Sequence, residues 1–308
     1  MGTEAFSKPM NMVARNIKAS IPYTCGELFQ GTLQGEPCLV SCPIAIGSEA
    51  SFKERRENSA SSGRKVQEVL KKIQPVLLAP QDLRVQTRLP VGRGFGTSTA
   101  DIGSALFAVS AYCGTELSAE EAARLAVSVE PTDSTFFPGL ALFAHRSGKF
   151  SQVLGEAPAL KILIADPGGF VDSEEFNNHD WGTALKHLSG AHVDAFMMLR
   201  TGIEKADINL IGQAASLSAQ IHQAILYNPF LEKALQLGKQ IGAVGVCRAH
   251  SGTIFGFLLA EEHDDEVELI DYCQKHLPGK INWTCTRILG GGARFITDSN
   301  DTSEALQR

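Results

Sequence analysis

The stretch Pro90-Val-Gly-Arg-Gly-Phe-Gly-Thr-Ser-Thr-Ala100 joins a predicted strand over 82–89 to a predicted alanine-rich helix over 101–113. Its three glycines, at alternate positions, free the backbone to bend and let peptide amides approach a ligand closely. The helix that follows adds unsatisfied N–H groups and the positive end of its dipole, so the stretch predicts a phosphate site. Hydroxyls of Thr97, Ser98 and Thr99 can bind phosphate oxygens or a magnesium ion, and Arg93 adds a positive charge.

Two familiar phosphate loops are excluded for this stretch. A Walker loop needs Gly-Lys-Ser/Thr, and the stretch has no lysine. The dinucleotide fingerprint G-x-G-x-x-G fails whether it is started at Gly92 or at Gly94. A plain turn with a Ser/Thr helix cap is the structural alternative, but glycines, hydroxyls and a helix start in one stretch favour phosphate.

Composition points to a folded, reduced, cytoplasmic protein. The chain has 308 residues, of which 44% are apolar and 20% charged, as in ordinary globular domains. Its net charge of -6 gives no general attraction for nucleic acid or an anionic membrane. We expect no secretory signal and no membrane span, because no apolar run approaches about 20 residues. The 7 cysteines are scattered, which favours free thiols over disulfides or a zinc site.

Hydrophobic patterning predicts an α+β protein in two lobes. Short strands are expected over 16–21, 38–44, 48–53, 141–143, 150–154 and 160–165. Helices are expected over 65–73 and after Ser118, which forms a capping box with Glu121, and then over much of 181–240. A strand-loop-strand unit over 242–259, an acidic helix and a strand over 282–289 follow. We predict domains over 1–157 and 158–298 and a flexible tail over 299–308.

A second segment with chemical potential is Val127–Pro138, which places Glu130 and Asp133 around Pro131. Proline ends the preceding helix, so these carboxylates should lie at its C-terminal end, where negative charge opposes the helix dipole. Two acids in that position suggest a cation partner, and ATP-bound magnesium is an obvious one. A solvated surface pair is the alternative.

The glycine-rich stretch resembles the second motif of the GHMP kinases, P-x-x-x-G-L-G-S-S-A, with Phe95 and Thr97 as departures. The resemblance implies a two-lobed fold with an N-terminal lobe like ribosomal protein S5 and a ferredoxin-like C-terminal lobe. ATP and substrate would bind in the cleft between them. It also implies that Ser98 and Glu130 hold magnesium and that Asp133 orients or deprotonates the alcohol, although the short spacing leaves the division of roles open. The residues implied to bind ATP are Pro90, Gly92, Arg93, Gly94, Phe95, Gly96, Thr97, Ser98 and Thr99.

Two further segments resemble the other GHMP motifs, in the right order. The first, 22–31, is by itself a strand end and turn, and by resemblance it lines the substrate side with Glu27 and Gln30. The second, 242–256, carries His250 and Ser251, which the resemblance places near the substrate. The histidine departs from the motif, and packing on the loop is the alternative to a substrate contact.

The strings around Glu27, Asp133 and His250 resemble the L-threonine kinase branch of this family, which serves cobalamin biosynthesis and propanediol utilisation. That likeness implies transfer of phosphate from ATP to L-threonine, giving O-phospho-L-threonine for the aminopropanol linker. L-Serine, ethanolamine, homoserine and an isoprenoid alcohol stay as alternative acceptors, and homodimerisation stays open. A non-catalytic nucleotide-binding regulator is disfavoured, because Ser98, Glu130 and Asp133 are all present. Candidates to bind a substrate carboxylate are Arg15, Arg248 and Arg287.

Overall fold

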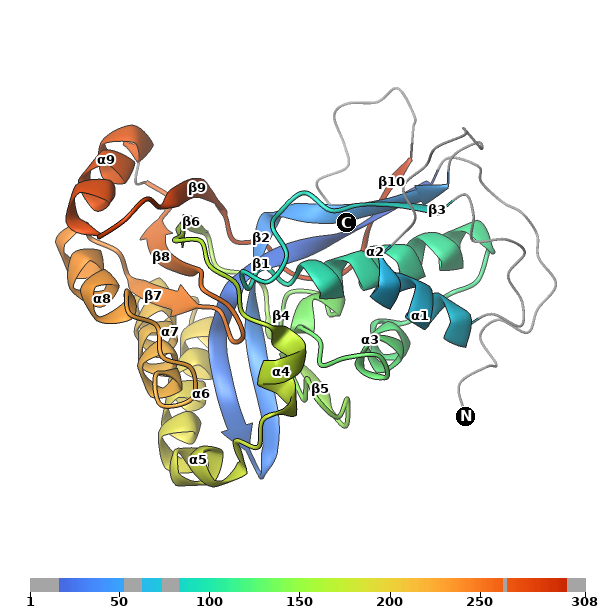
Figure 1. Ribbon diagram of the computed structural model, residues 1–308, viewed down its shortest axis with the longest axis horizontal. Coiled ribbons are helices and arrows are strands. Elements are labelled where there is room, and N and C mark those ends of the chain that lie inside the picture. The colour runs from blue at the N-terminus through green and yellow to red at the C-terminus, as the bar shows by residue number, and fades with distance from the viewer. Residues whose placement is uncertain (1–16, 53–62, 74–82, 263–264, 298–308) are drawn as a thin grey trace.

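A computed structural model describes residues 17–52, 63–73, 83–262 and 265–297. Its central feature is a long antiparallel hairpin of two 17-residue strands, β1 (Ile17–Leu33) and β2 (Glu36–Phe52), which runs through the whole molecule (Figure 1). The predicted strand ends at residues 21 and 44 are therefore wrong, as is the predicted strand end and turn over 22–31. The register shifts between Pro22 and Phe29 explain this error. Bulges there absorb the proline and Gly26, so these residues bend the strand instead of ending it.

The remaining strands extend the hairpin on both sides into one antiparallel sheet, in the order β5-β4-β2-β1-β7-β8-β6-β9. Strands β3 and β10 pair with β2 and β1 outside that path. The bounds are β3 (Leu83–Gln86), β4 (Leu140–Phe143), β5 (Ser151–Gly155), β6 (Leu160–Asp166), β7 (Gly245–Arg248), β8 (Phe255–Ala260), β9 (Asn282–Arg287) and β10 (Arg294–Thr297). The two halves of the chain are joined where Glu27 of β1 pairs with Arg248 of β7.

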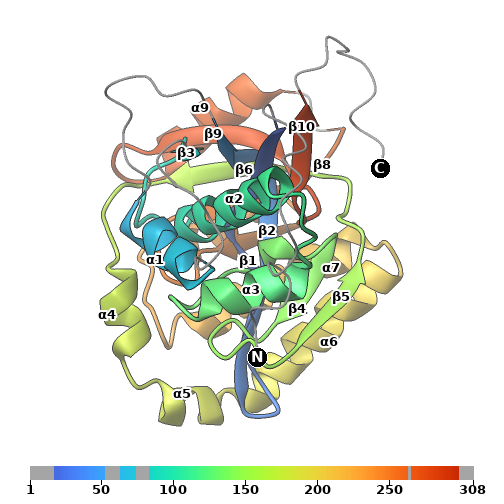
Figure 2. The same cartoon turned by 90° about the vertical axis from the view of Figure 1, so that its right-hand side faces the viewer.

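Helices α1 (Arg64–Lys72), α2 (Thr97–Tyr112) and α3 (Ala119–Val127) lie together in front of the hairpin (Figure 2). Helix α2 is buried on almost every side, which its run of alanines and small residues permits. It begins at Thr97, four residues before the predicted start, because the amide of Ala100 already bonds to the carbonyl of Gly96 at 3.0 Å. The hydroxyl residues of the glycine-rich stretch therefore form the first turn of the helix.

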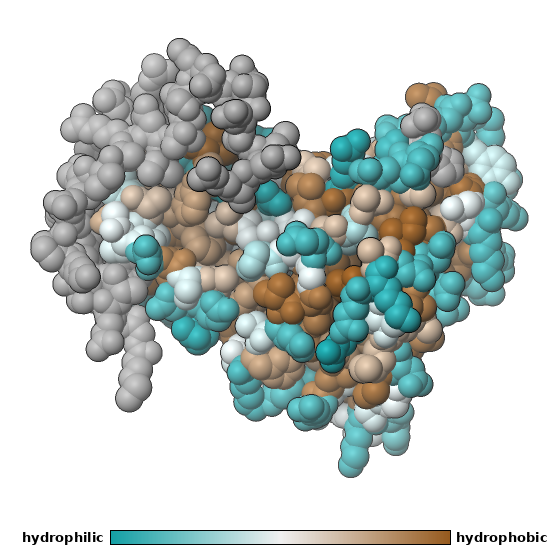
Figure 3. Space-filling view, turned by 180° about the vertical axis from the view of Figure 1, so that it is seen from behind, coloured by the Kyte–Doolittle hydropathy of each residue, from teal (hydrophilic) through white to brown (hydrophobic). Residues whose placement is uncertain are grey.

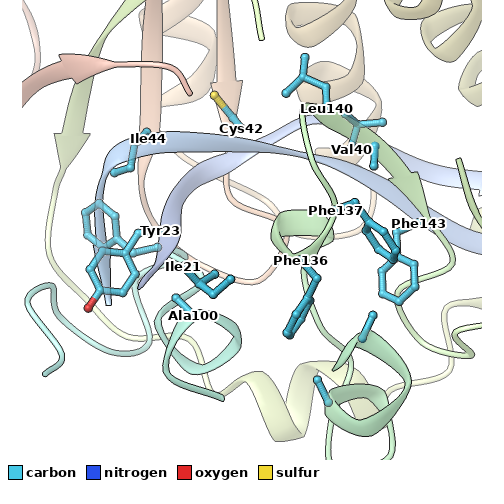
Figure 4. Packing of buried hydrophobic residues seen from close by; sticks show 14 of the residues in the cluster. Ile21, Tyr23, Val40, Cys42, Ile44, Ala100, Phe136, Phe137, Leu140 and Phe143 are labelled. Carbon is cyan, nitrogen blue, oxygen red and sulfur yellow. The ribbon is translucent and has the colours of Figure 1, made fainter. Parts of the chain in front are cut away.

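The core between α2 and the hairpin fixes the position of that first turn. Ile21 of β1 points toward Ala100 of α2 in Figure 4. Nearby, the rings of Phe137 and Phe143 pack with their centroids 5.1 Å apart. These side chains are all at most 2% exposed, so burial of their apolar surface stabilises the helix against the sheet.

Helices occupy most of the range 181–240, as predicted, and one more lies on either side of that range. Figure 1 shows all of these helices except the first on the other side of the hairpin from α1–α3. Their bounds are α4 (Ser173–Asn178), α5 (Gly182–His187), α6 (Ser189–Glu204), α7 (Ile208–His222), α8 (Leu231–Gln240) and α9 (Glu266–His276). The capping box of Ser118 and Glu121 is confirmed at the start of α3. In the part of the chain that is described, no helix is long and apolar enough to cross a bilayer.

The predicted boundary near residue 157 stays a prediction, since one continuous sheet runs across it. The predicted tail over 299–308 and the first 16 residues lie outside the described residues. On the face seen from behind, apolar side chains are mixed with polar ones and gather near its lower centre (Figure 3). Homodimerisation stays a prediction.

Candidate active site

The three glycines of the glycine-rich stretch all adopt positive φ angles, and their neighbours leave no room for a side chain. A Cβ on Gly94 would lie 2.2 Å from the Cβ of Ala249, and one on Gly96 would lie 2.3 Å from Oδ2 of Asp133. Gly96 (φ 63°) is also the N-cap of α2, without a capping side chain. The amides of the first turn of α2 therefore face outward at the positive end of the helix, where the helix itself supplies no acceptors.

A cavity of about 520 Å³ opens over this helix start. Elements far apart in the sequence form its wall. They are strands β1 and β2, the start of α1, the glycine-rich stretch, the segment after α3, the turn after β4, α4 with the segment before it, and the loop after β7. The predicted site residues on its wall are Glu27, Gly92, Gly94, Phe95, Gly96, Thr97, Ser98, Thr99, Glu130, Asp133, His250 and Ser251. The structure thus brings one residue or more from each predicted segment into a single cavity.

Glu130 is the centre of one polar cluster in the cavity. The hydroxyl of Ser98 donates a hydrogen bond to its Oε1, and Lys65 of α1 forms an ion pair with its Oε2. The sequence predicted a cation partner for the acids, and this lysine is one. Lys65 was missed because it belongs to no motif; its one signal in the sequence is its place at the start of a predicted helix.

Asp133 is held on the other side of the α2 start. Its backbone amide donates to the Thr99 hydroxyl at 3.1 Å, and that hydroxyl also accepts from Thr132 at 2.8 Å. Thr99 therefore positions this carboxylate. Removal from water raises the pKa of Asp133 to about 6, and the charge of Glu130 adds to the effect. A carboxylate with a pKa near neutrality is suited to accept a proton.

Glu27 is the second carboxylate at this side of the cavity. It is 3% exposed, and its Oε2 has no hydrogen-bond partner among the described residues. Burial, followed by the charge of Asp133, raises its pKa well above the ordinary value, while a hydrogen bond from Ser41 acts in the opposite direction. The charge of Asp133 and the burial of Glu27 therefore both favour the neutral form of Glu27.

His250 lies at the far end of the cavity, in a packed cluster of rings. Its ring centroid is 4.9 Å from that of His145, 5.1 Å from that of His222 and 5.3 Å from that of Phe176. Its Nδ1 lies 2.9 Å from Oε1 of Gln30, which does not itself line the cavity. Desolvation lowers the pKa of His250 to about 3, so the imidazole is neutral. The histidine packs on the loop and also lines the cavity, and its contact with a substrate stays a prediction.

Of the residues predicted to bind ATP, Pro90 and Arg93 do not line the cavity. The guanidinium of Arg93 lies 3.3 Å from Oδ1 of Asp166 at the end of β6. The backbone carbonyl of Arg93 accepts hydrogen bonds from the amides of Thr253 and Ile254. These bonds hold the glycine-rich stretch against the loop after β7.

Of the three arginines considered for a substrate carboxylate, Arg248 and Arg287 have other partners and do not line the cavity. Arg248 is fully buried and donates to Gln223 and to the carbonyl of Leu226, both at 2.7 Å. Arg287 lies 3.8 Å from Glu261 on the outer strand β9. Arg15 lies outside the described residues.

The oxygens of Ser98 and Glu130 fit magnesium. They are hard donors in mutual contact at the start of α2, and Mg²⁺ is commonly bound by one or two protein oxygens together with substrate phosphates and water. No cluster of three or more His, Cys, Asp or Glu side chains suited to a metal occurs in the described residues. This donor set is therefore suited to a metal that arrives with a phosphate ligand.

Comparisons with known proteins agree with this architecture. Residues 64–137 match the GHMP kinases N terminal domain. The chain is 31% identical to an L-threonine kinase of Citrobacter freundii over 90% of this chain and 99% of that one. It is 29% identical to an L-threonine kinase of Salmonella typhimurium over 82% and 85% of the two chains. Its fold matches a putative homoserine kinase of Listeria monocytogenes with a TM-score of 0.68, at 15% identity, covering 92% of this chain and 100% of that one.

The chain therefore belongs to the GHMP kinase family, and the predicted family and fold class are confirmed. It is an ATP-dependent kinase that acts on a small alcohol.

Proposed function

We propose that this kinase transfers the γ-phosphate of ATP to the hydroxyl of L-threonine, giving O-phospho-L-threonine. The observation that carries the proposal is Asp133, a carboxylate with a pKa of about 6 that shares one cavity with the N-terminus of α2. The activity named for the two relatives supports L-threonine as the acceptor.

In the proposed reaction the substrate hydroxyl oxygen forms a bond to the γ-phosphorus, and its proton passes to Asp133. The bond from that phosphorus to the β–γ bridging oxygen breaks, and its electron pair leaves with ADP. Backbone amides of the glycine-rich stretch and the first turn of α2 would hold the phosphates. Lys65 would add a positive charge close to them. Phosphoryl transfer depends mainly on such positioning and charge neutralisation.

The hydroxyl oxygen of Ser98 and the carboxylate of Glu130 would hold Mg²⁺. When bound, Mg²⁺ neutralises charge on the phosphates. Lys65 would then lose part of its interaction with Glu130 and become available to phosphate oxygens. The predicted use of the product for the aminopropanol linker of cobalamin, and a cytoplasmic location, stay predictions.

The first experiment measures ADP release with Mg-ATP and L-threonine, L-serine, L-homoserine, ethanolamine or 1-amino-2-propanol, with mass identification of the product. The proposal predicts the highest kcat/KM for L-threonine and a product identical to O-phospho-L-threonine. Asp133→Asn serves as the control for a contaminating kinase. A higher kcat/KM for another acceptor would overturn L-threonine as the substrate while leaving the kinase chemistry in place.

A further inference from the structure

One apolar side chain of the cavity wall stands apart from the hydrophobic core. Leu39 of β2 lines the cavity and is only 1% exposed. Most buried apolar side chains of the described residues pack into two clusters, and Leu39 belongs to neither, although its neighbours Cys38 and Val40 belong to the larger one. Leu39 therefore turns apolar surface toward the cavity. Because so little of that surface is exposed, one small group would cover it.

The sheet register places Leu39 beside the histidines of the cavity. On one side it pairs with Gln30 of β1, whose Oε1 lies 2.9 Å from Nδ1 of His250. On the other side it pairs with Phe143 of β4, which precedes His145 by two residues. Both histidines line the cavity, so Leu39 lies in the part of the wall that they form.

The acids lie close to the next residues of β2. Ser41, two positions after Leu39, pairs with Glu27 of β1. The amide of Ser41 donates to Oγ of Ser134 at 3.0 Å, and its own Oγ accepts from the amide of Ser134 at 3.1 Å. Ser134 directly follows Asp133. Leu39 is therefore placed between the histidines and the carboxylate that would accept the proton.

We define the acceptor end of the cavity as the wall formed by Glu27, Leu39, Asp133, His145 and His250. Four of these side chains are polar, and Leu39 is the aliphatic one. In a small-molecule site, polar groups orient the ligand and apolar side chains supply most of the remaining contact. Because the acceptor hydroxyl would lie beside Asp133, the surface of Leu39 is available to a small apolar group next to that hydroxyl.

We propose that Leu39 contacts a methyl group on the carbon that carries the acceptor hydroxyl. Leu39 is then a specificity-determining residue, which makes the kinase prefer a secondary alcohol to the corresponding primary alcohol. The inference rests on the proposed function, since L-threonine has this methyl group and L-serine does not. One such group in an apolar contact changes kcat/KM by about 10- to 200-fold.

The test uses two pairs of acceptors that differ by this methyl group: L-threonine with L-serine, and 1-amino-2-propanol with ethanolamine. For the unmodified protein we expect kcat/KM to be about 10- to 200-fold higher for L-threonine than for L-serine. In Leu39→Ala this ratio should fall by about tenfold or more, because L-threonine loses a contact that L-serine never made. Leu39→Met conserves the volume and the apolar surface, so it should retain most of the ratio.

The ratio is insensitive to partial unfolding, since both acceptors are measured on one preparation of each variant. Leu142→Ala is the matched control, because Leu142 of β4 is buried in the larger core cluster and does not line the cavity. It should lower Tm, as Leu39→Ala does, but leave the ratio unchanged. Equal losses for L-threonine and L-serine in Leu39→Ala would show a purely structural role and overturn the inference. L-Threonine turnover, and with it the proposed function, would stand.

Failure of the proposed function gives a different result. If L-serine, L-homoserine or ethanolamine has the highest kcat/KM, the preferred acceptor is a primary alcohol, and the proposed function and the inference are both overturned. If 1-amino-2-propanol has the highest kcat/KM, L-threonine is overturned as the substrate. The role of Leu39 then stands if the advantage of 1-amino-2-propanol over ethanolamine falls in Leu39→Ala, and it is overturned if that advantage is unaltered.

Discussion

The hydroxyl of Thr99, in the first turn of α2, accepts a hydrogen bond from the backbone amide of Asp133 at 3.1 Å. The contact joins the helix that would bind phosphate to the backbone of the residue whose carboxylate would accept the proton, across 34 positions of sequence. The position of Asp133 relative to the start of α2 therefore depends on the hydroxyl of Thr99. Thr99 is 4% exposed.

Thr99→Val should lower kcat by about tenfold or more, because it keeps the shape of the side chain and removes the acceptor. Two buried donors, the Asp133 amide and the Thr132 hydroxyl, would lose their partner, at a cost of about 1–3 kcal/mol of stability each. Steady-state kinetics and thermal unfolding measure the two effects. Thr99→Ser keeps the hydroxyl and should retain most of the activity; equal losses in both variants would show that the methyl group matters instead.

Gly96→Ala should displace the Asp133 carboxylate, since the new Cβ would lie 2.3 Å from its Oδ2. We expect kcat to fall by about 100-fold, the loss that a misplacement of about 1 Å can cause. In the Asp133→Asn background the same change should cost much less, because the two substitutions affect one group.

Gly35→Ala is the control for backbone strain. Gly35 also has a positive φ, of 81°, but a Cβ there meets nothing within 4 Å. It should reduce stability by about 1–2 kcal/mol without changing kcat. Full additivity of Gly96→Ala and Asp133→Asn would argue against displacement of the carboxylate.

The activity should rise with pH through the pKa of Asp133, about 6, because only the ionised carboxylate accepts a proton. This rising limb of the pH–rate profile should appear in kcat/KM for the alcohol between about pH 5 and pH 7. Asp133→Asn should lower kcat by about 10²- to 10⁴-fold and abolish that limb, with the Kd of ATP nearly unchanged. A variant that retains both the rate and the pH limb would remove Asp133 from the mechanism.

The same raised pKa predicts that the stability contributed by Asp133 falls as the pH rises, whereas the activity rises. The folded pKa of about 6 exceeds the ordinary value of 3.8, so the folded protein holds this proton more tightly than the unfolded chain does. The contribution of Asp133 to the free energy of unfolding is therefore most favourable at low pH and declines as the pH rises from about 4 to about 6. Asp133→Asn should raise Tm at pH 7, and the difference should disappear below about pH 4. A lower Tm at pH 7 would contradict this expectation.

Glu130→Gln should raise the magnesium concentration needed for half-maximal activity by about tenfold or more, because it removes the charged oxygen proposed to bind the metal. Ser98→Ala should have a smaller effect in the same direction. Glu49→Gln is the control, since Glu49 pairs with Arg88 outside the cavity. An unaltered magnesium titration in Glu130→Gln would remove that residue as a ligand.

Local sequence signals were sufficient for part of the fold and of the site. The capping box at Ser118 begins α3, and the glycine-rich stretch precedes α2, because both depend on residues within a few positions of one another. The hairpin was not predicted at its full length. Pro22 and Gly26 look like the end of a strand, whereas the register with β2 allows bulges at these positions.

By itself, the sequence determined the chemical groups of the site: glycines and hydroxyls at a helix start, two acids after the next helix, and their order along the chain. Only the tertiary structure decided which groups meet. Lys65 reaches Glu130 across 65 positions, and the amide of Asp133 reaches Thr99 across 34. The physical reason is that propensity and capping act between neighbours in sequence, whereas the pairing of distant charges depends on how the sheet and helices pack around a common core.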